Sequence, residues 1–326
     1  MDVELAPQAG ADYIRPFQIE GLGIRGRAVR LSAVADEIIH KHAYPAPVAN
    51  LLAEMLTISA ALAAALKYEG VFTLQTKSDG AVKLMVVDVT SAGAMRGYAQ
   101  FDAEAVAALP ADASLPRLLG GGYLAFTVDQ GEDTDRYQGI VELIGADLVE
   151  CVQHYFQQSE QLKAGFKLAA TIDPTVNPTV NPTVNPTVNP GAPNGHWRTG
   201  VIMLQRLPAG ENPVAVEEAD EAWRHAVTLL ASCTSKELLD PDLPIDDLLY
   251  RLFHEEGVRV FKGHTPLAQC RCSHKRVESV LRSLPQDELK DLEVDGALEV
   301  TCEFCNSKYR FTLTDLAEKP DDNATA

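Results

Sequence analysis

The chain has 326 residues, a length that predicts two or three structural units rather than one small domain. Its 28 basic and 46 acidic residues give a formal net charge of −18, so neither nucleic acid nor an anionic membrane surface is an expected partner. Hydrophobic residues make up 46% of the chain and charged residues 23%, a balance that supports a folded core and excludes wholesale disorder.

The amino-terminal residues show no basic start followed by an apolar stretch, so we expect no secretory signal. The longest uncharged apolar window, residues 55–66, is shorter than the roughly 20 residues that a membrane-spanning helix needs. We therefore expect a cytoplasmic protein. In that compartment stable disulfides are rare, and clustered cysteines more often bind a metal or carry out redox chemistry.

The first 170 residues mix strand and helix patterns. Alternating or β-branched residues predict strands at 17–19, 27–31, 71–74, 82–87, 124–128 and 140–144. Apolar residues at helical spacing after Pro45 and Pro47 predict a long helix that reaches residue 66, and residues 148–157 predict another. Gly120 to Gly122 lack the Lys-Ser or Lys-Thr of a phosphate loop and are interpreted as a turn. These patterns predict an α+β fold with an amino-terminal domain over residues 1–210.

A low-complexity insert interrupts this domain. Thr-Val-Asn-Pro occurs four times in tandem from Thr175 to Pro190. Proline at every fourth position removes backbone donors and disfavours both helix and central strand. The sequence predicts an extended, exposed loop over residues 173–196 rather than a binding motif, and the strand pattern resumes at residues 201–204.

Residues 211–262 are predicted to form an acidic helical linker. Apolar stripes at helical spacing run over residues 216–230 and 245–253. Between residues 211 and 256 there are twelve acidic residues and only three basic ones. Helices this short owe their stability mainly to packing, and their like charges repel. The pattern fits a docked, easily released linker and two permanently packed helices equally well.

Four of the six cysteines fall in the last sixty residues as two tight pairs, Cys270 with Cys272 and Cys302 with Cys305. Two thiol pairs joined by an intervening fold match the tetrahedral four-sulfur site of structural zinc. We expect these four cysteines to bind one Zn²⁺ in a module over residues 263–313, with residues 314–326 as a flexible tail.

The local pattern around each pair supports a small folded module. The second pair is expected at the tip of a hairpin, where Asn306 tolerates a left-handed backbone. Between the pairs, Ser273 is placed to cap a short helix that carries Val277, Val280, Leu281 and Leu284 and stops at Pro285.

The first pair has unusual spacing, because only Arg271 separates its cysteines. The two sulfurs are close enough to bond to each other if a metal is lost, and a disulfide across so small a loop is the strained, labile kind. Arg271, Lys275, Arg276 and the metal itself favour the thiolate, the form that oxidants attack. The site is therefore interpreted as a redox sensor.

A module of about fifty residues has a marginal core, whereas zinc contributes on the order of 10–16 kcal/mol to the folding of small metal modules. We expect oxidation of the thiolates to expel the metal and to unfold the module. The acidic linker is expected to follow.

The other candidate residues are less suited to bind a metal or to catalyse a reaction. Cys151 and Cys233 stand alone and are expected to be buried and inert. His264 and His274 flank the first pair, but four cysteines already complete a zinc shell. The sequence shows no nucleophile elbow, paired-histidine zinc motif or dinucleotide fingerprint, so no enzyme activity is expected.

Two other classes remain as alternatives. A zinc-ribbon nucleic-acid-binding protein could use the same ligands, although it should carry a basic stripe that this acidic chain lacks. A thiol-disulfide oxidoreductase could use Cys302 and Cys305, although that motif normally opens a helix and the residues after Cys305 predict a strand.

At the level of motifs, the chain resembles the redox-regulated thirty-three-kilodalton heat-shock chaperone family, bacterial holdases that act without ATP. The resemblance rests on Val29-Arg30-Leu31, Arg96-Gly97-Tyr98, Arg136-Tyr137-Gln138-Gly139-Ile140-Val141, Tyr155-Phe156 with Ser159-Glu160-Gln161, Leu204-Gln205, and the cysteine pattern with Phe304 and Tyr309. Lys163-Ala164 stands where the family usually has Pro-Thr, and the Thr-Val-Asn-Pro insert is not part of the family pattern.

The resemblance implies a function that the residues alone do not give. It implies that all four cysteines bind zinc when reduced, and that oxidation forms the disulfides Cys270–Cys272 and Cys302–Cys305. It further implies a chaperone that is activated by oxidative stress, binds unfolding client proteins and forms a homodimer when oxidised.

Overall fold

The computed structural model describes residues 11–110, 112–131, 136–160, 162–173, 195–206, 213–294 and 296–317. The chain divides into two compact units, one that ends at Ala268 and one that begins at Gln269. Both helices and strands are present throughout, so the predicted α+β class is confirmed. The Thr-Val-Asn-Pro repeats lie outside the described residues.

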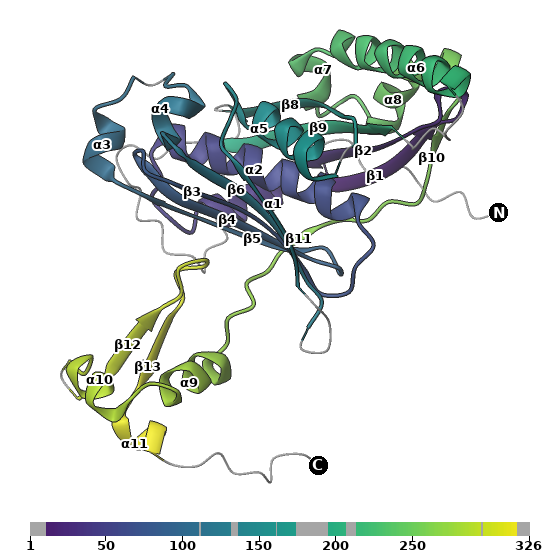
Figure 1. Ribbon diagram of the computed structural model, residues 1–326. Coiled ribbons are helices and arrows are strands. Elements are labelled where there is room, and N and C mark those ends of the chain that lie inside the picture. Colours follow the sequence, from purple (N-terminus) through teal and green to yellow (C-terminus); the bar gives the residue numbers. More distant parts are fainter. Residues whose placement is uncertain are drawn as a thin grey trace, which may run out of the picture. The chain divides into compact units, whose positions relative to one another are not determined.

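The first unit contains two β-sheets (Figure 1). The first sheet is antiparallel and its strands lie in the order β10 (Val258–Val260), β1 (Tyr13–Ile19), β2 (Ile24–Leu31), β9 (His196–Arg206) and β8 (Ala164–Asp173). The second has the order β11 (Leu267–Ala268), β5 (Ala94–Phe101), β4 (Val82–Thr90), β3 (Val71–Ser78), β6 (Gly122–Asp129) and β7 (Tyr137–Glu142). Only β11, which lies parallel to β5, departs from antiparallel pairing in this second sheet.

Helix α2 (Ala46–Ala65) is the centre of this unit and packs against strands of both sheets. It starts after Pro45 with Pro47 in its first turn, a placement that suits proline because those amides have no helical partner. The helix is long and apolar enough to cross a membrane, but 78% of its apolar window is buried inside the protein. Its apolar character therefore builds the core, as expected for a helix that is hydrophobic on all sides.

Shorter helices complete the first unit around this core. They are α1 (Ala33–Ile39), α3 (Ala103–Ala107), α4 (Leu115–Leu119) and α5 (Leu148–Tyr155), with a π-helical turn at Phe156–Glu160 and 3₁₀ turns at Glu20–Leu22 and His254–Glu256. The predicted turn before β6 is confirmed, since Gly120 has a φ of 64° and the strand starts at Gly122.

The acidic segment forms helices α6 (Pro213–Ser232), α7 (Ser235–Leu239) and α8 (Ile245–Phe253), which cover the outer face of the first sheet (Figure 1). Its apolar stripes pack into a second core with the sheet, which is made of Phe17, Ile19, Ile24, Ala28, Ala169, Ile202, Leu204, Ala226, Leu230, Cys233, Leu238, Ile245, Leu248, Leu249 and Phe253. The segment thus lies within the first unit, and its apolar residues find their partner surface there.

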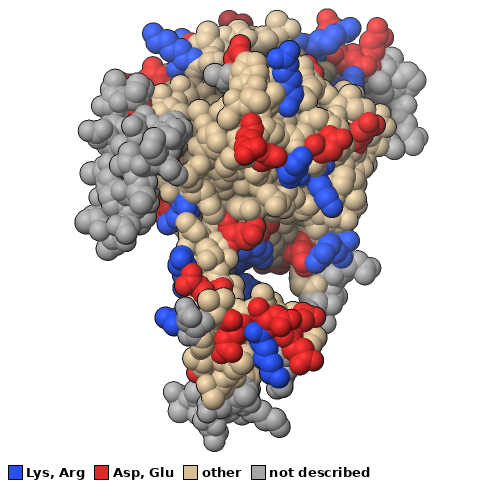
Figure 2. Space-filling view, turned by 90° about the vertical axis from the view of Figure 1, so that its left-hand side faces the viewer, with Lys and Arg blue, Asp and Glu red and all other residues tan. Residues whose placement is uncertain are grey.

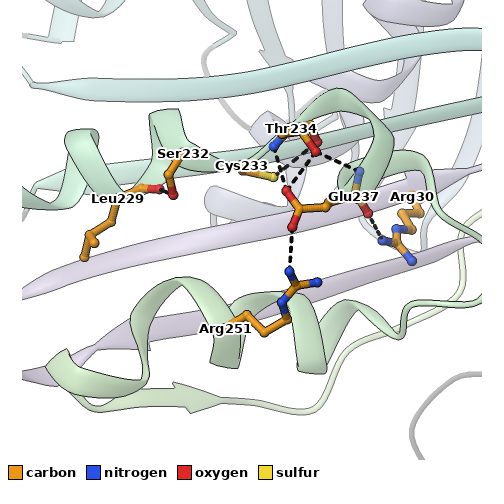
Figure 3. Close-up of polar contacts among 7 residues, drawn as sticks. All are labelled: Arg30, Leu229, Ser232, Cys233, Thr234, Glu237 and Arg251. Atoms are coloured by element: carbon orange, nitrogen blue, oxygen red, sulfur yellow. Dashed lines mark hydrogen bonds and ion pairs between the residues drawn. The ribbon is translucent and has the colours of Figure 1, made fainter.

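Helix α7 is fixed at its start by a capping box. The Thr234 hydroxyl accepts a hydrogen bond from the Glu237 amide at 3.2 Å, and the Glu237 carboxylate accepts one from the Thr234 amide at 3.0 Å. Glu237 also forms an ion pair with Arg251 of α8 at 2.7 Å, which links the two helices (Figure 3).

The second unit is small. Its elements are α9 (His274–Arg282), α10 (Gln286–Asp291), β12 (Leu298–Thr301), β13 (Lys308–Phe311) and α11 (Leu313–Ala317). Its buried core consists of Leu281, Leu289, Leu298, Phe311 and Leu316. The predicted Ser273 cap is confirmed, because its side chain accepts a hydrogen bond from the Arg276 amide. Val280 is 61% exposed, so the apolar face of α9 is narrower than the helical spacing predicted.

Arg30 of β2 anchors the end of α7 to the first sheet. Its guanidinium donates hydrogen bonds to the carbonyl oxygens of Leu238 and Leu243 and to that of Glu237, the contact drawn in Figure 3, and its side chain is buried. We expect Arg30→Met to lower the free energy of unfolding by about 2–3 kcal/mol, because it leaves buried carbonyls without this donor. Urea denaturation of the reduced protein measures the change. The control Arg117→Met alters an exposed arginine and should change stability by less than about 0.5 kcal/mol; equal midpoints for the two variants would contradict the anchoring role.

Glu54 lies on the core helix α2, where burial raises the pKa of its carboxyl group to about 7, although the Asn50 amide donates a hydrogen bond to it at 3.1 Å. Between the ordinary value of 4.5 and about 7 the folded protein holds a proton that the unfolded chain has lost. Stability should therefore fall as pH rises through this window and stay low above it.

Glu54→Gln removes this charge, so we expect it to raise the free energy of unfolding at pH 8 by roughly 1–3 kcal/mol and to have little effect at pH 4.5. Denaturant titrations at several pH values test this. Glu69→Gln, which changes an exposed glutamate, is the control and should leave the pH profile unchanged.

Candidate metal centre

The four predicted cysteines converge in the second unit. All four sulfurs lie within 4.8 Å of one another. Cys270 Sγ is 3.7 Å from Cys302 Sγ, and Cys272 Sγ is 3.3 Å from Cys305 Sγ. A tetrahedron with metal–sulfur bonds near 2.3 Å has edges of about 3.8 Å. The sulfurs are therefore spaced as the four corners around one metal ion, and no other such group occurs among the described residues.

The second pair brackets the turn between β12 and β13. The Cys302 amide donates to the Ser307 carbonyl and the Asn306 amide donates to the Cys302 carbonyl, each at 2.8 Å. Asn306 has a φ of 59° and is the one non-glycine residue with a positive φ in the described part of the chain. The left-handed conformation predicted for Asn306 is confirmed, and it reverses the chain directly after Cys305.

The first pair lies on the non-helical segment that leads into α9. Arg276, in the first turn of α9, donates a side-chain hydrogen bond to the Arg271 carbonyl at 2.8 Å. This contact and the Ser273 cap fix the segment against the helix, which places both sulfurs on the side of the hairpin.

Hydrogen-bond donors surround the sulfur cluster. The Tyr309 hydroxyl donates to Cys272 Sγ at 3.1 Å, and the Ser307 hydroxyl lies 3.2 Å from Cys305 Sγ. Burial raises the pKa of Cys302, and hydrogen bonds from the backbone amides of Cys305 and Phe304 partly oppose this. Such donors stabilise negative charge on sulfur, which is the form that binds metals.

The thiols nevertheless differ in acidity. Burial raises the pKa of Cys272 to about 12, and the Tyr309 hydroxyl only partly opposes this. Burial also acts to raise the pKa of Cys305, but hydrogen bonds with the hydroxyl and amide of Ser307 and with Cys272 and Cys302 together outweigh it and bring the value to about 7. Four thiolates at this spacing repel one another, so a divalent cation is the partner that allows all four to ionise.

The neighbouring candidates do not join the cluster. The His274 ring packs against Phe311 with ring centroids 4.4 Å apart, and His264 lies in the first unit, where its backbone pairs with Ile14. Cys151 and Cys233 are buried, as predicted, and burial raises the pKa of both thiols, that of Cys151 to about 11. Both are unreactive in this environment.

Comparison with known proteins gives the family. The family model described as Hsp33 protein matches residues 12–312. The chain belongs to the Hsp33 family. This confirms the resemblance inferred from the motifs, and it covers both units and the cysteine cluster.

Relatives match over nearly the whole chain. The 33 kDa chaperonin of Caulobacter vibrioides (strain NA1000 / CB15N) is 40% identical over 313 residues, which cover 94% of this chain and 97% of the relative. That of Ectopseudomonas mendocina is 37% identical over 309 residues, 94% of each chain. The crystal structure of the 33 kDa chaperonin from Thermotoga maritima has the same fold, with a TM-score of 0.74 at 22% identity, and the match covers 94% of this chain and 96% of that one.

The left-handed residue offers a test of the hairpin's role in metal binding. Asn306→Ala should cost about 1 kcal/mol, because alanine is strained at this φ, and should weaken zinc binding about fivefold. Competition with a chromophoric chelator measures the affinity. Asn306→Gly is the control, since glycine adopts a positive φ freely and should keep most of the affinity; identical affinities for all three proteins would show that the turn conformation does not support the site.

Proposed function

We propose that this protein is a redox-regulated, ATP-independent molecular chaperone, a holdase that oxidative stress activates and that prevents aggregation of unfolding proteins. Membership of the Hsp33 family and the relatives named 33 kDa chaperonin support a chaperone function. The observation that carries the redox part is the convergence of four sulfurs within 4.8 Å in a unit with a very small core.

In the reduced protein, Cys270, Cys272, Cys302 and Cys305 hold one Zn²⁺ per chain. The sulfur spacing and the donors from Tyr309 and Ser307 fit a closed tetrathiolate site. A core of five buried side chains stabilises the second unit only weakly. The metal supplies the rest, since zinc contributes on the order of 10–16 kcal/mol to the folding of small zinc modules. The reduced protein is folded and inactive.

Oxidation joins Cys270 to Cys272 and Cys302 to Cys305. Each disulfide forms with the loss of two electrons from a pair of zinc-bound thiolates; two equivalents of hydrogen peroxide accept the four electrons, take up four protons from solvent and become four water molecules, while Zn²⁺ is released. Disulfide sulfurs no longer hold zinc, and the second unit loses its main source of stability. Its unfolding frees the acidic linker, residues 211–262, from the first sheet.

Release of the linker exposes apolar surface that binds clients. The outer face of the first sheet carries Phe17, Ile19, Ile24, Ile202 and Leu204, which α6 to α8 cover in the folded protein. The oxidised protein acts in the cytoplasm as a homodimer and binds unfolding proteins through this face and the freed linker. It has no catalytic residues.

The alternatives fit less well. A nucleic-acid-binding zinc ribbon needs a basic surface, but the chain has a net charge of −18, and the face in Figure 2 shows acidic and basic side chains interspersed. An oxidoreductase motif opens a helix, whereas Cys302 and Cys305 lie between strands β12 and β13.

Hypochlorite, or peroxide at raised temperature, should release one zinc per chain and start suppression of the aggregation of thermally unfolding citrate synthase. Zinc is measured with a colorimetric chelator and aggregation by light scattering. Cys151→Ala keeps all four clustered cysteines and should respond as the parent does. Zinc release without gain of holdase activity would refute the chaperone assignment.

Thiol trapping and mass spectrometry of the same samples test the disulfide pairing. We expect the two pairs that are close in sequence. The cross-pairs Cys270–Cys302 and Cys272–Cys305, whose sulfurs lie 3.7 and 3.3 Å apart, would contradict the proposed connectivity.

A further inference from the structure

One segment adds a strand to the edge of both sheets in the first unit. Residues 257–268, here called the strap, contribute β10 beside β1 and then β11 beside β5 (Figure 1). Between the two strands, His264 pairs with Ile14 of β1 as an isolated bridge. The strap therefore covers the β1 edge of one sheet and the β5 edge of the other.

Backbone hydrogen bonds hold the strap in place. The Phe261 amide donates to the Pro16 carbonyl at 2.9 Å, and Ile14 and His264 exchange two bonds of 3.0 and 3.1 Å. The Glu20 amide donates to the Gly257 carbonyl at 3.0 Å. Even the buried Arg15 side chain donates to a strap carbonyl, that of Phe261, at 3.0 Å. The contacts thus recognise a polypeptide backbone rather than a particular sequence.

Several of the strap's side chains are partly open to water. Val260, Phe261 and Leu267 are 39%, 40% and 45% exposed, although Val258 packs against the second core and Ala268 against the first. The backbone bonds that hold the strap are ones that another extended chain can make. Pro16 has no amide hydrogen to donate, which is typical of an edge strand, and without the strap β1 is the edge strand of its sheet.

The position of the strap in the chain connects it to the cysteines. It begins directly after the 3₁₀ turn that follows α8 and ends at Ala268, two residues before Cys270. Residues 257–262 of the strap belong to the acidic linker and residues 263–268 to the predicted metal module, and under the proposed function both segments lose their structure on oxidation. Folded structure then holds the strap at neither end, so we expect it to leave, and the backbone groups of β1 that face it lose their hydrogen-bond partners.

We propose that the β1 edge, once the strap has left, binds an extended segment of an unfolding client protein as an added antiparallel strand. This inference rests on the proposed function. An unpaired edge is a template for another strand, and main-chain pairing gives affinity without demanding a sequence. Such recognition suits a partner that is defined only by being unfolded, and the strap itself shows that an extended chain with solvent-exposed side chains fits the edge.

Hydrogen exchange with mass spectrometry of the full chain tests the proposal, with thermally unfolding citrate synthase as the probe client. The amides of Ile14 and Glu20 donate to the strap, so they should exchange slowly in the reduced protein and at least tenfold faster in the oxidised protein. Addition of the client should restore their protection. Retained client with β1 still exchanging fast would overturn this inference alone, whereas failure to retain any client would overturn the proposed function.

Two other results would also decide against the proposal. Slow exchange of β1 in oxidised, client-free protein would show that the strap stays bound. If that protection instead grew with protein concentration, a second copy of this chain would be the occupant.

A substitution at Gly263 should displace the strap without altering any of the four clustered cysteines. A Cβ there would lie 2.2 Å from the Ile14 carbonyl oxygen and 2.5 Å from the Tyr13 ring, so Gly263→Ala must push the strap away. We expect the reduced, zinc-loaded variant to show fast exchange at Ile14 and partial holdase activity without oxidant. The control Gly121→Ala meets nothing closer than 3.6 Å and should stay protected and inactive.

Slow exchange at β2 and β9 verifies that the Gly263→Ala variant is folded. An open β1 edge with no suppression of aggregation would show that this edge does not bind clients.

Discussion

The convergence of four sulfurs is the contact on which the second unit depends. Without a cation, burial raises the pKa of Cys272 and so opposes its ionisation, whereas hydrogen-bond donors lower the pKa of Cys305. The buried apolar core is correspondingly slight, with five side chains shared among three short helices and a hairpin. Under the proposed function, one tetrathiolate metal site gives this unit most of its stability, and thiolates are also the form that oxidants attack. In that proposal, structural stability and redox sensitivity depend on the same four sulfur atoms.

The first unit is organised in the opposite way. Its long apolar helix lies between two sheets and most of its residues are buried, so many separate contacts contribute to its stability. The acidic helices α6 to α8 lie on the outside of this body. They repel one another through excess negative charge, yet buried cations of the first sheet, Arg30 and Arg15, bind their backbone carbonyls and Asp246. The attachment thus combines an apolar face with a few strong polar contacts.

Much of this organisation could be predicted from the sequence, and the failures have physical reasons. Cysteine spacing identified the four convergent residues, and proline placement identified the core helix. The sequence did not predict strand β5, because its inward positions include Gly97 and Ala99, small residues that make room for α2 and break the alternation of large apolar residues. The pairing of β10 with β1 joins segments about 240 residues apart, which no local pattern reveals. The sequence analysis did not identify Ser307 and Tyr309 as hydrogen-bond partners of the cysteine sulfurs. Their hydroxyl groups, two and four residues after Cys305, could have indicated this role.

The sandwiched position of α2 has a consequence for recovery after stress. The helix and both sheets form a core that contains none of the clustered cysteines, so under the proposed function this core stays folded on oxidation and the unfolded parts remain covalently attached to it. When the thiols are restored under that proposal, the linker and the second unit must fold again, and the linker must regain its long-range contacts with the first sheet. The proposed cycle nevertheless leaves the larger part of the polypeptide folded.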